Sequence, residues 1–254
     1  MPREKQFEIS PGLQHWRNQI PSTYYCTHSL APLMYITDTM PIRVNALSIA
    51  DPEQEKLSIR VGDPASVILC RMDNGAVFRL YGMRLPGYGA FRLTGSRGMM
   101  EAGYGANGSV RIILNEWELR EGESADMTYK PKFKSHHDIA KKAGHGGGDF
   151  WTTHLFAEAV RTGEQPYLNV YRGVAMSVVG ILGWKSALQE GAPFAVPDFS
   201  KEAERRLHEH DDWSPWPEDR RPGQPWPSIR GQLTPSDEAV AYAKDIWSKK
   251  GRSF

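Results

Sequence analysis

Two short polar segments carry the side chains best suited to chemistry. Residues 24–37, YYCTHSLAPLMYIT, place Tyr25, Thr27 and His28 at the expected start of a helix, and residues 143–156, AGHGGGDFWTTHLF, place His145 and Asp149 around three glycines. Tyrosine and histidine move protons or hold hydroxyl groups. This mixture suits a polyol or a sugar better than an apolar ligand. The alternative is that these residues are buried polar groups whose hydrogen bonds are satisfied within the protein.

The glycine turn is expected to deliver its two polar neighbours to a helix start. Glycine lets the backbone adopt positive φ and approach another surface closely. A helical apolar pattern follows at once, formed by Trp151, Leu155 and Ala159 and widened by Phe150 and Val160. A helix N-terminus carries partial positive charge and favours an anion, so His145 and Asp149 are candidates to meet a ligand. Equally, Asp149 simply caps its helix and His145 lies on a loop.

Three other patterns resemble known motifs and carry less weight. Residues 103–108 match the G-x-G-x-x-G nucleotide fingerprint, but a β-branched strand rather than a helix follows, and Asn107 with Gly108 is typical of a hairpin turn. The segments 136–138, HHD, and 208–212, HEHDD, contain metal-ligand residue types without the spacing of a zinc motif. We expect no cofactor-binding or metal-binding residue from these patterns, and we expect the last segment to be a solvated helix end.

The first half of the chain is predicted to form strands. Apolar alternation of period two begins at Pro41, and Asp73, Asn74 and Gly75 are a strong hairpin signal between strands at 66–72 and 76–83. After a turn at Pro86 and Gly87, further strands are predicted at 88–96, 98–105, 109–119 and 126–133. The pattern predicts a meander of about five to seven antiparallel strands.

Helices are predicted after the glycine turn, over 148–162, 167–190 and 235–249. Ser200 and either Thr234 or Ser236 are the expected caps of the later helices, and 195–199 is expected to return to the sheet. The long helix is expected to face the core through Val170, Val174, Val178, Ile181 and Leu182. Strands followed by helices predict an α+β fold, in which an open, mostly antiparallel β-sheet has helices packed on one face.

The two ends of the chain are expected to be less regular. Residues 1–23 are predicted to be an N-terminal loop segment, and 211–254 a Pro/Trp-rich tail with a C-terminal helix. Between them, 24–210 form the α+β domain. Its first helix is expected to be capped by Thr27 or Ser29 and to face the core through Leu33, Met34 and Ile36.

Composition excludes several classes of partner. The 254 residues carry a net charge of +1, so nothing favours nucleic acid or an anionic membrane. Two cysteines, Cys26 and Cys70, give no disulfide framework and fit a reducing compartment. The longest apolar run, 173–184, is too short to span a bilayer, and the polar N-terminus is not a signal peptide. We therefore expect a cytoplasmic protein.

Three segments in order resemble one family: TYYCTHSLAPLMYIT, AGHGGGDFWTTHLF and NVYRGVAMSVVGILGWKSALQEGAPFAVPDF. They are similar to the C-terminal domain of Gfo/Idh/MocA-type oxidoreductases, which are NAD(P)-dependent sugar and polyol enzymes. The branch that looks most similar contains NAD-dependent glycosidases of the alpha-N-acetylgalactosaminidase type. The resemblance implies an open antiparallel sheet, a sugar site and a homo-oligomer contact made by the sheet.

The resemblance also implies roles for individual residues. Tyr25, Thr27 and His28 match a tyrosine-x-threonine-histidine stretch that contacts the sugar, with Tyr25 and His28 as the catalytic pair. Arg17 resembles a substrate-contacting arginine, and Tyr129 a tyrosine that follows the sheet. His145 and Asp149 match a GHGG-x-D turn that lines the site.

The sequence departs from that family in three respects. It shows neither a strand–GxGxxG–helix unit nor a Glu-Lys-Pro segment, and an aspartate that the oxidoreductases place four residues before the histidine is Tyr24 here. We therefore expect the substrate-binding and oligomerisation domain of an NAD(P)-dependent oxidoreductase, with NAD or NADP held by a separate nucleotide-binding domain and not bound tightly by this chain alone. Two alternatives remain, an NAD-dependent glycoside hydrolase domain and a non-catalytic, stand-alone sugar-binding or assembly protein.

Overall fold

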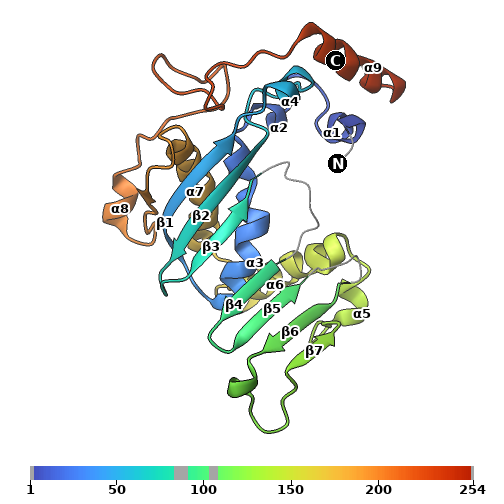
Figure 1. Ribbon diagram of the computed structural model, residues 1–254, viewed down its shortest axis with the longest axis vertical. Helices are drawn as coiled ribbons and strands as arrows, with labels where there is room; N and C mark the ends of the chain where they lie inside the picture. Colours follow the sequence, from blue (N-terminus) through green and yellow to red (C-terminus); the bar gives the residue numbers. More distant parts are fainter. Residues whose placement is uncertain (1–2, 83–90, 103–107, 253–254) are drawn as a thin grey trace. The chain divides into compact units, whose positions relative to one another are not determined.

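The computed structural model describes residues 3–82, 91–102 and 108–252, which divide into two compact units. Unit 1 combines Met1–Pro86 with Val170–Phe254, and unit 2 is Gly87–Asn169. Each unit holds one four-stranded sheet, in the order β3-β2-β1-β8 in unit 1 and β4-β5-β6-β7 in unit 2 (Figure 1). The α+β class is confirmed, with the predicted strands divided between two sheets. The predicted turn at Pro86 and Gly87 and most of the pattern 103–108 lie outside the described residues.

The sheet of unit 1 contains β1 (Pro41–Ile49), β2 (Ala65–Met72), β3 (Val77–Tyr81) and β8 (Phe194–Ala195). The predicted hairpin joins β2 to β3: the amide of Gly75 donates to the carbonyl of Met72 at 3.0 Å, and Gly75 adopts φ +86°, which glycine tolerates. The expected return to the sheet is also confirmed, because Ala195 of β8 pairs with Arg43 of β1.

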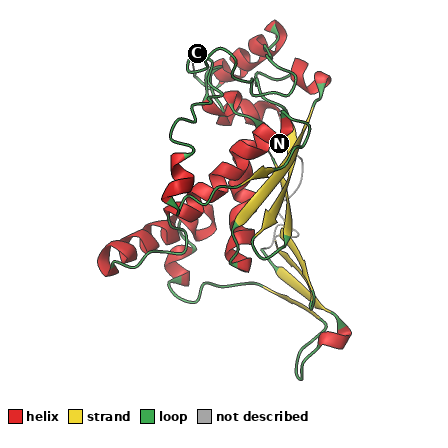
Figure 2. Ribbon diagram, turned by 90° about the vertical axis from the view of Figure 1, so that its left-hand side faces the viewer, coloured by secondary structure: helices red, strands yellow, loops and turns green. Residues whose placement is uncertain are grey.

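Helices cover one face of this sheet. The long helix α7 (Val170–Ala187) packs on β1, the 3₁₀ helix η1 (Ser22–Cys26) on β2, and α3 (Thr27–Thr37) on β3. Figure 2, turned by 90° from Figure 1, shows these helices to one side of the strands. The buried strand positions alternate as a half-buried sheet requires; they are Val44, Ala46, Ile68, Cys70, Met72, Phe78 and Leu80.

The predicted core face of α7 is only partly right. Leu182 is buried, but Val170 is 66% exposed and Ile181 is 37% exposed. The face that packs carries mostly small residues, among them Ala175, Gly180 and Gly183. A Cβ added to Gly180 would lie 2.9 Å from the carbonyl oxygen of Thr23. The helix therefore turns its small residues toward η1, which approaches too closely for large side chains.

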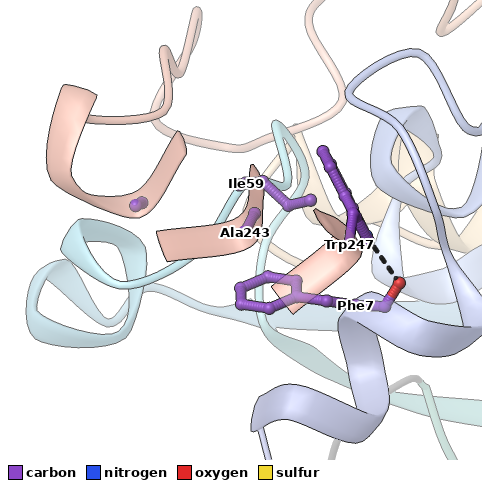
Figure 3. Packing of buried hydrophobic residues seen from close by; sticks show 5 residues of the cluster. Phe7, Ile59, Ala243 and Trp247 are labelled. Carbon is purple, nitrogen blue, oxygen red and sulfur yellow. Dashed lines mark hydrogen bonds between the residues drawn. The ribbon is translucent and has the colours of Figure 1, made fainter. Parts of the chain in front are cut away.

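The predicted N-terminal loop is instead largely helical. The structure has α1 (Arg3–Ile9), α2 (Trp16–Gln19) and then η1. Phe7 of α1 packs in a buried cluster with Ala243 and Trp247 of α9 (Asp237–Lys249), and the indole N–H of Trp247 donates to the carbonyl of Phe7 at 2.9 Å (Figure 3). Local periodicity misses α1 because its packing partners lie at the opposite end of the chain.

The tail is irregular as expected, yet it is fixed to unit 1. The Ser228 hydroxyl donates to the buried carboxylate of Asp63 at 2.6 Å, and the indole N–H of Trp184 donates to the carbonyl of Trp226 at 3.1 Å. The predicted cap Ser236 is confirmed, since its hydroxyl accepts the amide of Ala239 at 3.1 Å. Two short helices, α4 (Pro52–Lys56) and α8 (Glu202–Arg206), complete this unit.

Other cap predictions are wrong. Lys201 precedes α8, while Ser200 bonds its hydroxyl to Asp198 at 2.6 Å and so stays in the preceding turn. Cys26, with no side-chain cap, precedes α3, because η1 already turns the chain into that helix. Ile36 of α3 is exposed rather than part of the core. None of the helices in the described residues has the length and apolar character to cross a bilayer.

Unit 2 contains β4 (Phe91–Gly95), β5 (Gly98–Ala102), β6 (Val110–Leu114) and β7 (Asp126–Tyr129). The strand predicted at 109–119 ends early, in the 3₁₀ turn η2 (Glu116–Glu118). Then come α5 (His137–Ala140), η3 (His145–Gly147) and α6 (Gly148–Thr162), and the predicted bounds of α6 are confirmed. Its apolar stripe is not a core face, since Leu155 is 46% exposed and Val160 is 72% exposed.

Candidate functional site

The first part of the candidate site is built on α2, which is held by its own side chains. The Nδ1 atom of His15 accepts the amide of Arg17 at 3.2 Å and caps the helix. The buried amide of Asn18 donates to the carbonyls of Ser10 and Gly12, at 3.3 and 3.0 Å. This bracing places Trp16 and Arg17 at the surface of unit 1, with Trp16 exposed and Arg17 half-buried.

The second part lies at the junction of η1 and α3. Tyr25 has φ −93° and ψ 39°, which breaks the helical path between the two elements. Cys26 is fully buried, and its thiol lies 3.7 Å from the carbonyl of Met176 in α7. Because Cys26 anchors the junction, its neighbours Tyr25 and Thr27 remain half-buried, and His28 is exposed. Thr27 is the first residue of α3 rather than its cap.

Three of the predicted residues come together through their rings and charges. Tyr25 stacks on His28 with centroids 4.6 Å apart and an angle of 19°. The Arg17 guanidinium lies 4.3 Å from the centroid of the Trp16 ring and 6.0 Å from that of Tyr25. We name Trp16, Arg17, Tyr25 and His28 the aromatic–arginine cluster. It presents a phenol, an imidazole and a guanidinium to one surface, a set that can bind several hydroxyl groups at once.

Sequence reasoning missed two members of this neighbourhood. Trp16 lies 6.3 Å from Tyr25 between ring centroids, and His15 stacks on Trp16 at 5.9 Å. Burial and the nearby charges of Arg17 and Arg60 lower the pKa of His15, which favours the neutral ring. The signal in the sequence was the run His-Trp-Arg, an aromatic residue between two polar ones inside a segment predicted to be a loop.

His145 and Asp149 form a separate pair in unit 2. The Nδ1 atom of His145 lies 2.8 Å from Oδ1 of Asp149, and their side chains are 85% and 59% exposed. Gly147 precedes α6, so Asp149 stands in the first turn and binds His145 rather than capping the helix. A carboxylate on Nδ1 orients an imidazole and directs Nε2 to act as the working nitrogen.

The glycine turn holds this pair by close packing. Gly146 and Gly147 have φ +64° and +103°, and a Cβ on Gly147 would lie 2.9 Å from the ring of Phe133. Phe133 packs in turn against Trp151 of α6, with ring centroids 5.3 Å apart. Tyr129 ends β7 opposite Val110. The predicted residues thus fall into two groups, with Arg17, Tyr25, Thr27 and His28 in unit 1 and Tyr129, His145 and Asp149 in unit 2.

Other chemistry finds less support among the described residues. They include no group of three or more histidine, cysteine or acidic side chains placed to hold a metal ion. Cys26 and Cys70 are both buried, and burial raises the pKa of each thiol to about 12, which makes them poor nucleophiles. Every strand pair in the described part of the chain is antiparallel, so this part does not form the parallel βαβ unit that cradles a dinucleotide.

An open antiparallel sheet backed by helices is the architecture of the C-terminal domain of Gfo/Idh/MocA oxidoreductases, as the sequence led us to expect. Comparison with known families makes the assignment more specific. The family described as "Glycosyl hydrolase 109, C-terminal domain" matches residues 42–205, and the chain belongs to this family. The match includes Tyr129, His145 and Asp149 and begins after His28.

Curated relatives agree with this assignment. The chain is 26% identical over 205 residues to a glycosyl hydrolase family 109 protein of Solibacter usitatus (strain Ellin6076), covering 70% of this chain and 45% of the relative. It is also 26% identical over 148 residues to such a protein of Stenotrophomonas maltophilia (strain K279a), covering 57% of this chain and 32% of the relative. The chain spans less than half the length of these relatives.

Solved structures share the fold. Levoglucosan dehydrogenase, in complex with NADH and levoglucosan, superposes with a TM-score of 0.57 at 16% identity, over 76% of this chain and 55% of that one. An NAD binding oxidoreductase from Klebsiella pneumoniae superposes with a TM-score of 0.52 at 12% identity, over 67% and 49%. At such identities the likeness concerns the fold alone.

Proposed function

We propose that this chain binds a sugar or polyol as the substrate-binding domain of an NAD(P)-dependent enzyme. The observation that carries the proposal is the convergence of Arg17, Tyr25 and His28 in the aromatic–arginine cluster. Membership of the glycosyl hydrolase 109 family favours glycoside cleavage as the reaction of the whole enzyme, over the oxidation of a polyol that the sequence put first.

The cluster suits a sugar in three ways. The guanidinium of Arg17 is a fixed fork of donors for hydroxyl or amide oxygens. The faces of Trp16 and Tyr25 offer apolar surface to the C–H side of a sugar ring. The Tyr25 hydroxyl and the His28 imidazole both donate and accept, so they can position a hydroxyl group and exchange a proton with it.

The cofactor belongs to the enzyme rather than to the described residues. Levoglucosan dehydrogenase binds NADH in the solved complex, and we infer that NAD or NADP serves the enzyme containing this chain. The described strands form only antiparallel ladders rather than the parallel βαβ unit that cradles a dinucleotide, so we assign no cofactor contact to the described part of the chain. A separate nucleotide-binding domain is the partner that this proposal requires.

Binding by the purified chain tests the proposal. Saturation-transfer NMR with N-acetylgalactosamine, a methyl galactoside and myo-inositol should show saturable binding of at least one, lost in Arg17→Gln and His28→Ala. His210→Ala, an exposed histidine outside the cluster, is the matched control and should bind as the unaltered chain does. Binding that survives both cluster substitutions would place the sugar elsewhere, and no binding of any of the three would contradict the proposal.

The reaction needs a second measurement, with a nucleotide-binding partner and NAD added. Release of the aglycone from an aryl glycoside without net NADH would identify glycoside cleavage. Stoichiometric NADH from a free polyol would identify oxidation. Sugar binding without either product would support the third candidate, a non-catalytic binding protein.

We also propose that unit 1 pairs with a second copy through the uncovered face of its sheet. Cross-strand partners on one face of a sheet lie side by side, and β2 pairs Val67 with Leu47 and Tyr81, and Leu69 with Asn45 and Arg79. Leu47, Leu69, Val77 and Tyr81 are all large and exposed there. Large exposed apolar side chains gathered on one sheet face, here interspersed with Asn45 and Arg79, favour an interaction surface.

A further inference from the structure

A small cavity in unit 1 is lined by cations. Its volume is about 270 Å³, and its walls come from α4, the segment after it and the tail before α9. The charged side chains that line it are Lys56, Arg60 and Arg230, and Thr234 and Ser236 add hydroxyl groups. Among the described side chains of this lining, three are cationic and none is acidic. The tail side of the cavity lies outside the residues 42–205 that match the family.

The walls of this cavity are joined by hydrogen bonds. The Ser236 hydroxyl donates to the carbonyl of Lys56 at 2.9 Å, which ties the start of α9 to the end of α4. The amide of Arg230 donates to the hydroxyl of Ser228 at 3.0 Å, and Ser228 is itself bound to the buried Asp63. Lys56 and Arg60, which are close in sequence, are therefore brought together with Arg230 of the distant tail by fixed backbone segments.

We propose that this cavity binds a small phosphate-bearing anion. A phosphate group offers several acceptor oxygens in different directions, whereas a carboxylate is planar and is satisfied by a single arginine fork. Cations from α4, the segment after it and the tail, together with the hydroxyl group of Thr234, match the phosphate better. The volume leaves room for a phosphate group and a short organic body, below the range of about 300–1,000 Å³ for drug-sized ligands.

The nearby carboxylates set the strength of such binding. Lys56 is paired at 2.7 Å with the exposed Glu53. An exposed ion pair contributes little free energy, so a ligand can displace it. The charge of Arg230 reaches the carboxyl of Asp63, and Asp237 and Glu238 follow in the first turn of α9. Because of these acids, we expect weak binding that depends strongly on salt.

Arg60 links the cavity electrostatically to His15, which lies beside the aromatic–arginine cluster. Arg60 lines the cavity, and its charge helps to lower the pKa of His15, whose ring stacks on Trp16. A bound dianion would compensate that charge and raise the pKa of His15. The titration of His15 therefore reports occupancy without any assay of enzyme activity.

Titration of the purified chain with inorganic phosphate, followed by NMR and calorimetry, tests the inference. We expect saturable binding at low salt, weakened about tenfold in Arg230→Gln and in Lys56→Gln because each removes one charged hydrogen bond. Lys249→Gln, at the far end of α9, is the matched control and should bind as the unaltered chain does. A short phosphate monoester should bind at least as well as phosphate, and acetate much more weakly.

Each outcome decides the question. Binding that is lost in the two cavity variants, with a rise in the pKa of His15, supports the site. Equal binding in all variants places the anion elsewhere, and binding of acetate as strong as that of phosphate overturns the ligand class. Absence of saturable binding overturns the site itself. Neither a sugar nor a dinucleotide is involved, so these results stand apart from those on the proposed function.

Discussion

The phenol ring of Tyr25 lies 4.6 Å from the imidazole of His28 and stacks on it at an angle of 19°. The two residues flank a junction where a 3₁₀ helix becomes an α-helix, and the buried Cys26 between them fixes that junction to α7. The pairing gives a solvent-facing histidine a defined orientation without a carboxylate partner in the described contacts. It is the geometric basis of the sugar site that we propose.

Replacement of Tyr25 by phenylalanine removes the hydroxyl group but keeps the ring that stacks on His28, so it tests the two contributions separately. We expect Tyr25→Phe to keep the fold and the ring stack but to weaken sugar binding about tenfold, since one hydrogen bond to the ligand is lost. Tyr25→Ala should weaken binding further, because His28 then loses its neighbour. Tyr171→Phe, an exposed tyrosine on α7, is the control. NMR titration with whichever of the three test ligands binds the unaltered chain measures the effect. Equal binding by Tyr25→Phe and the unaltered chain would show that the hydroxyl does not contact the ligand.

Self-association should depend on the open face of the unit 1 sheet. Leu69 is 47% exposed at the centre of β2, and Leu69→Asp places a charge in the middle of the proposed interface. We expect the dimer to dissociate at least about tenfold more readily while the free energy of unfolding changes little, because the side chain is exposed. Ile139→Asp, on α5 of unit 2, is the control. Sedimentation equilibrium measures the dissociation of both variants. A monomeric unaltered chain would refute the interface.

The turn before α6 should be sensitive to a methyl group. Gly147 has φ +103°, and a Cβ there would meet Phe133 at 2.9 Å, whereas Gly163 has φ +75° with open space around it. Gly163→Ala should therefore cost about 1 kcal/mol, the strain of a left-handed conformation, and Gly147→Ala about 2 kcal/mol or more because the clash adds to it. Urea unfolding compares the two variants. Equal losses would show that the Phe133 ring moves aside at no cost in free energy. The contact between Gly147 and Phe133 would then not be what holds the turn.

Local sequence patterns predicted the turns, caps and helix bounds that depend on neighbouring residues. The hairpin at Asp73, Asn74 and Gly75, the bounds of α6 and the cap at Ser236 all depend on residues within a few positions of one another. The α+β class followed from the order of these elements. Of the candidate site, the pairing of Tyr25 with His28 was within reach, because both lie in one short segment.

Long-range packing was not visible in the sequence. Nothing near Phe7 indicates that Trp247 will cover it, so α1 was expected to be a loop. The core-facing side of α7 was expected to carry its largest apolar residues. Instead, Gly180 and Gly183 face η1, because that segment lies close to the helix. The role of Trp16 depends on its approach to Tyr25 from a different element, which no spacing rule expresses.

The contact between the two ends of the chain should make a measurable contribution to stability. Trp247 is 1% exposed and its N–H binds the carbonyl of Phe7, so Trp247→Ala loses both apolar burial and a hydrogen bond. We expect a loss of about 3–5 kcal/mol in the free energy of unfolding and faster hydrogen exchange in α1. Trp117→Ala, at an 81% exposed position of unit 2, is the control and should cost less than about 0.5 kcal/mol. Loss of α9 protection with α1 unchanged would show that the two helices are independent.

Asp63 is a buried carboxyl that fixes the tail through Ser228. Burial raises its pKa, although the Ser228 hydroxyl and the Ile229 amide, at 2.6 and 3.2 Å, favour the ionised form. An acid whose pKa is raised in the folded state binds its proton more tightly there, so its contribution to stability is present at low pH and declines as pH rises through the folded pKa.

Asp63→Asn cannot titrate, so we expect its stability deficit to shrink as the pH rises from about 4 to about 7. At neutral pH a deficit of about 1–3 kcal/mol should remain, because an asparagine cannot accept both hydrogen bonds. Urea unfolding at several pH values, with Asp73→Asn in the exposed hairpin turn as the control, measures the difference. A deficit that grows with pH would mean that the hydrogen bonds outweigh burial and that the pKa of Asp63 is lowered in the folded protein.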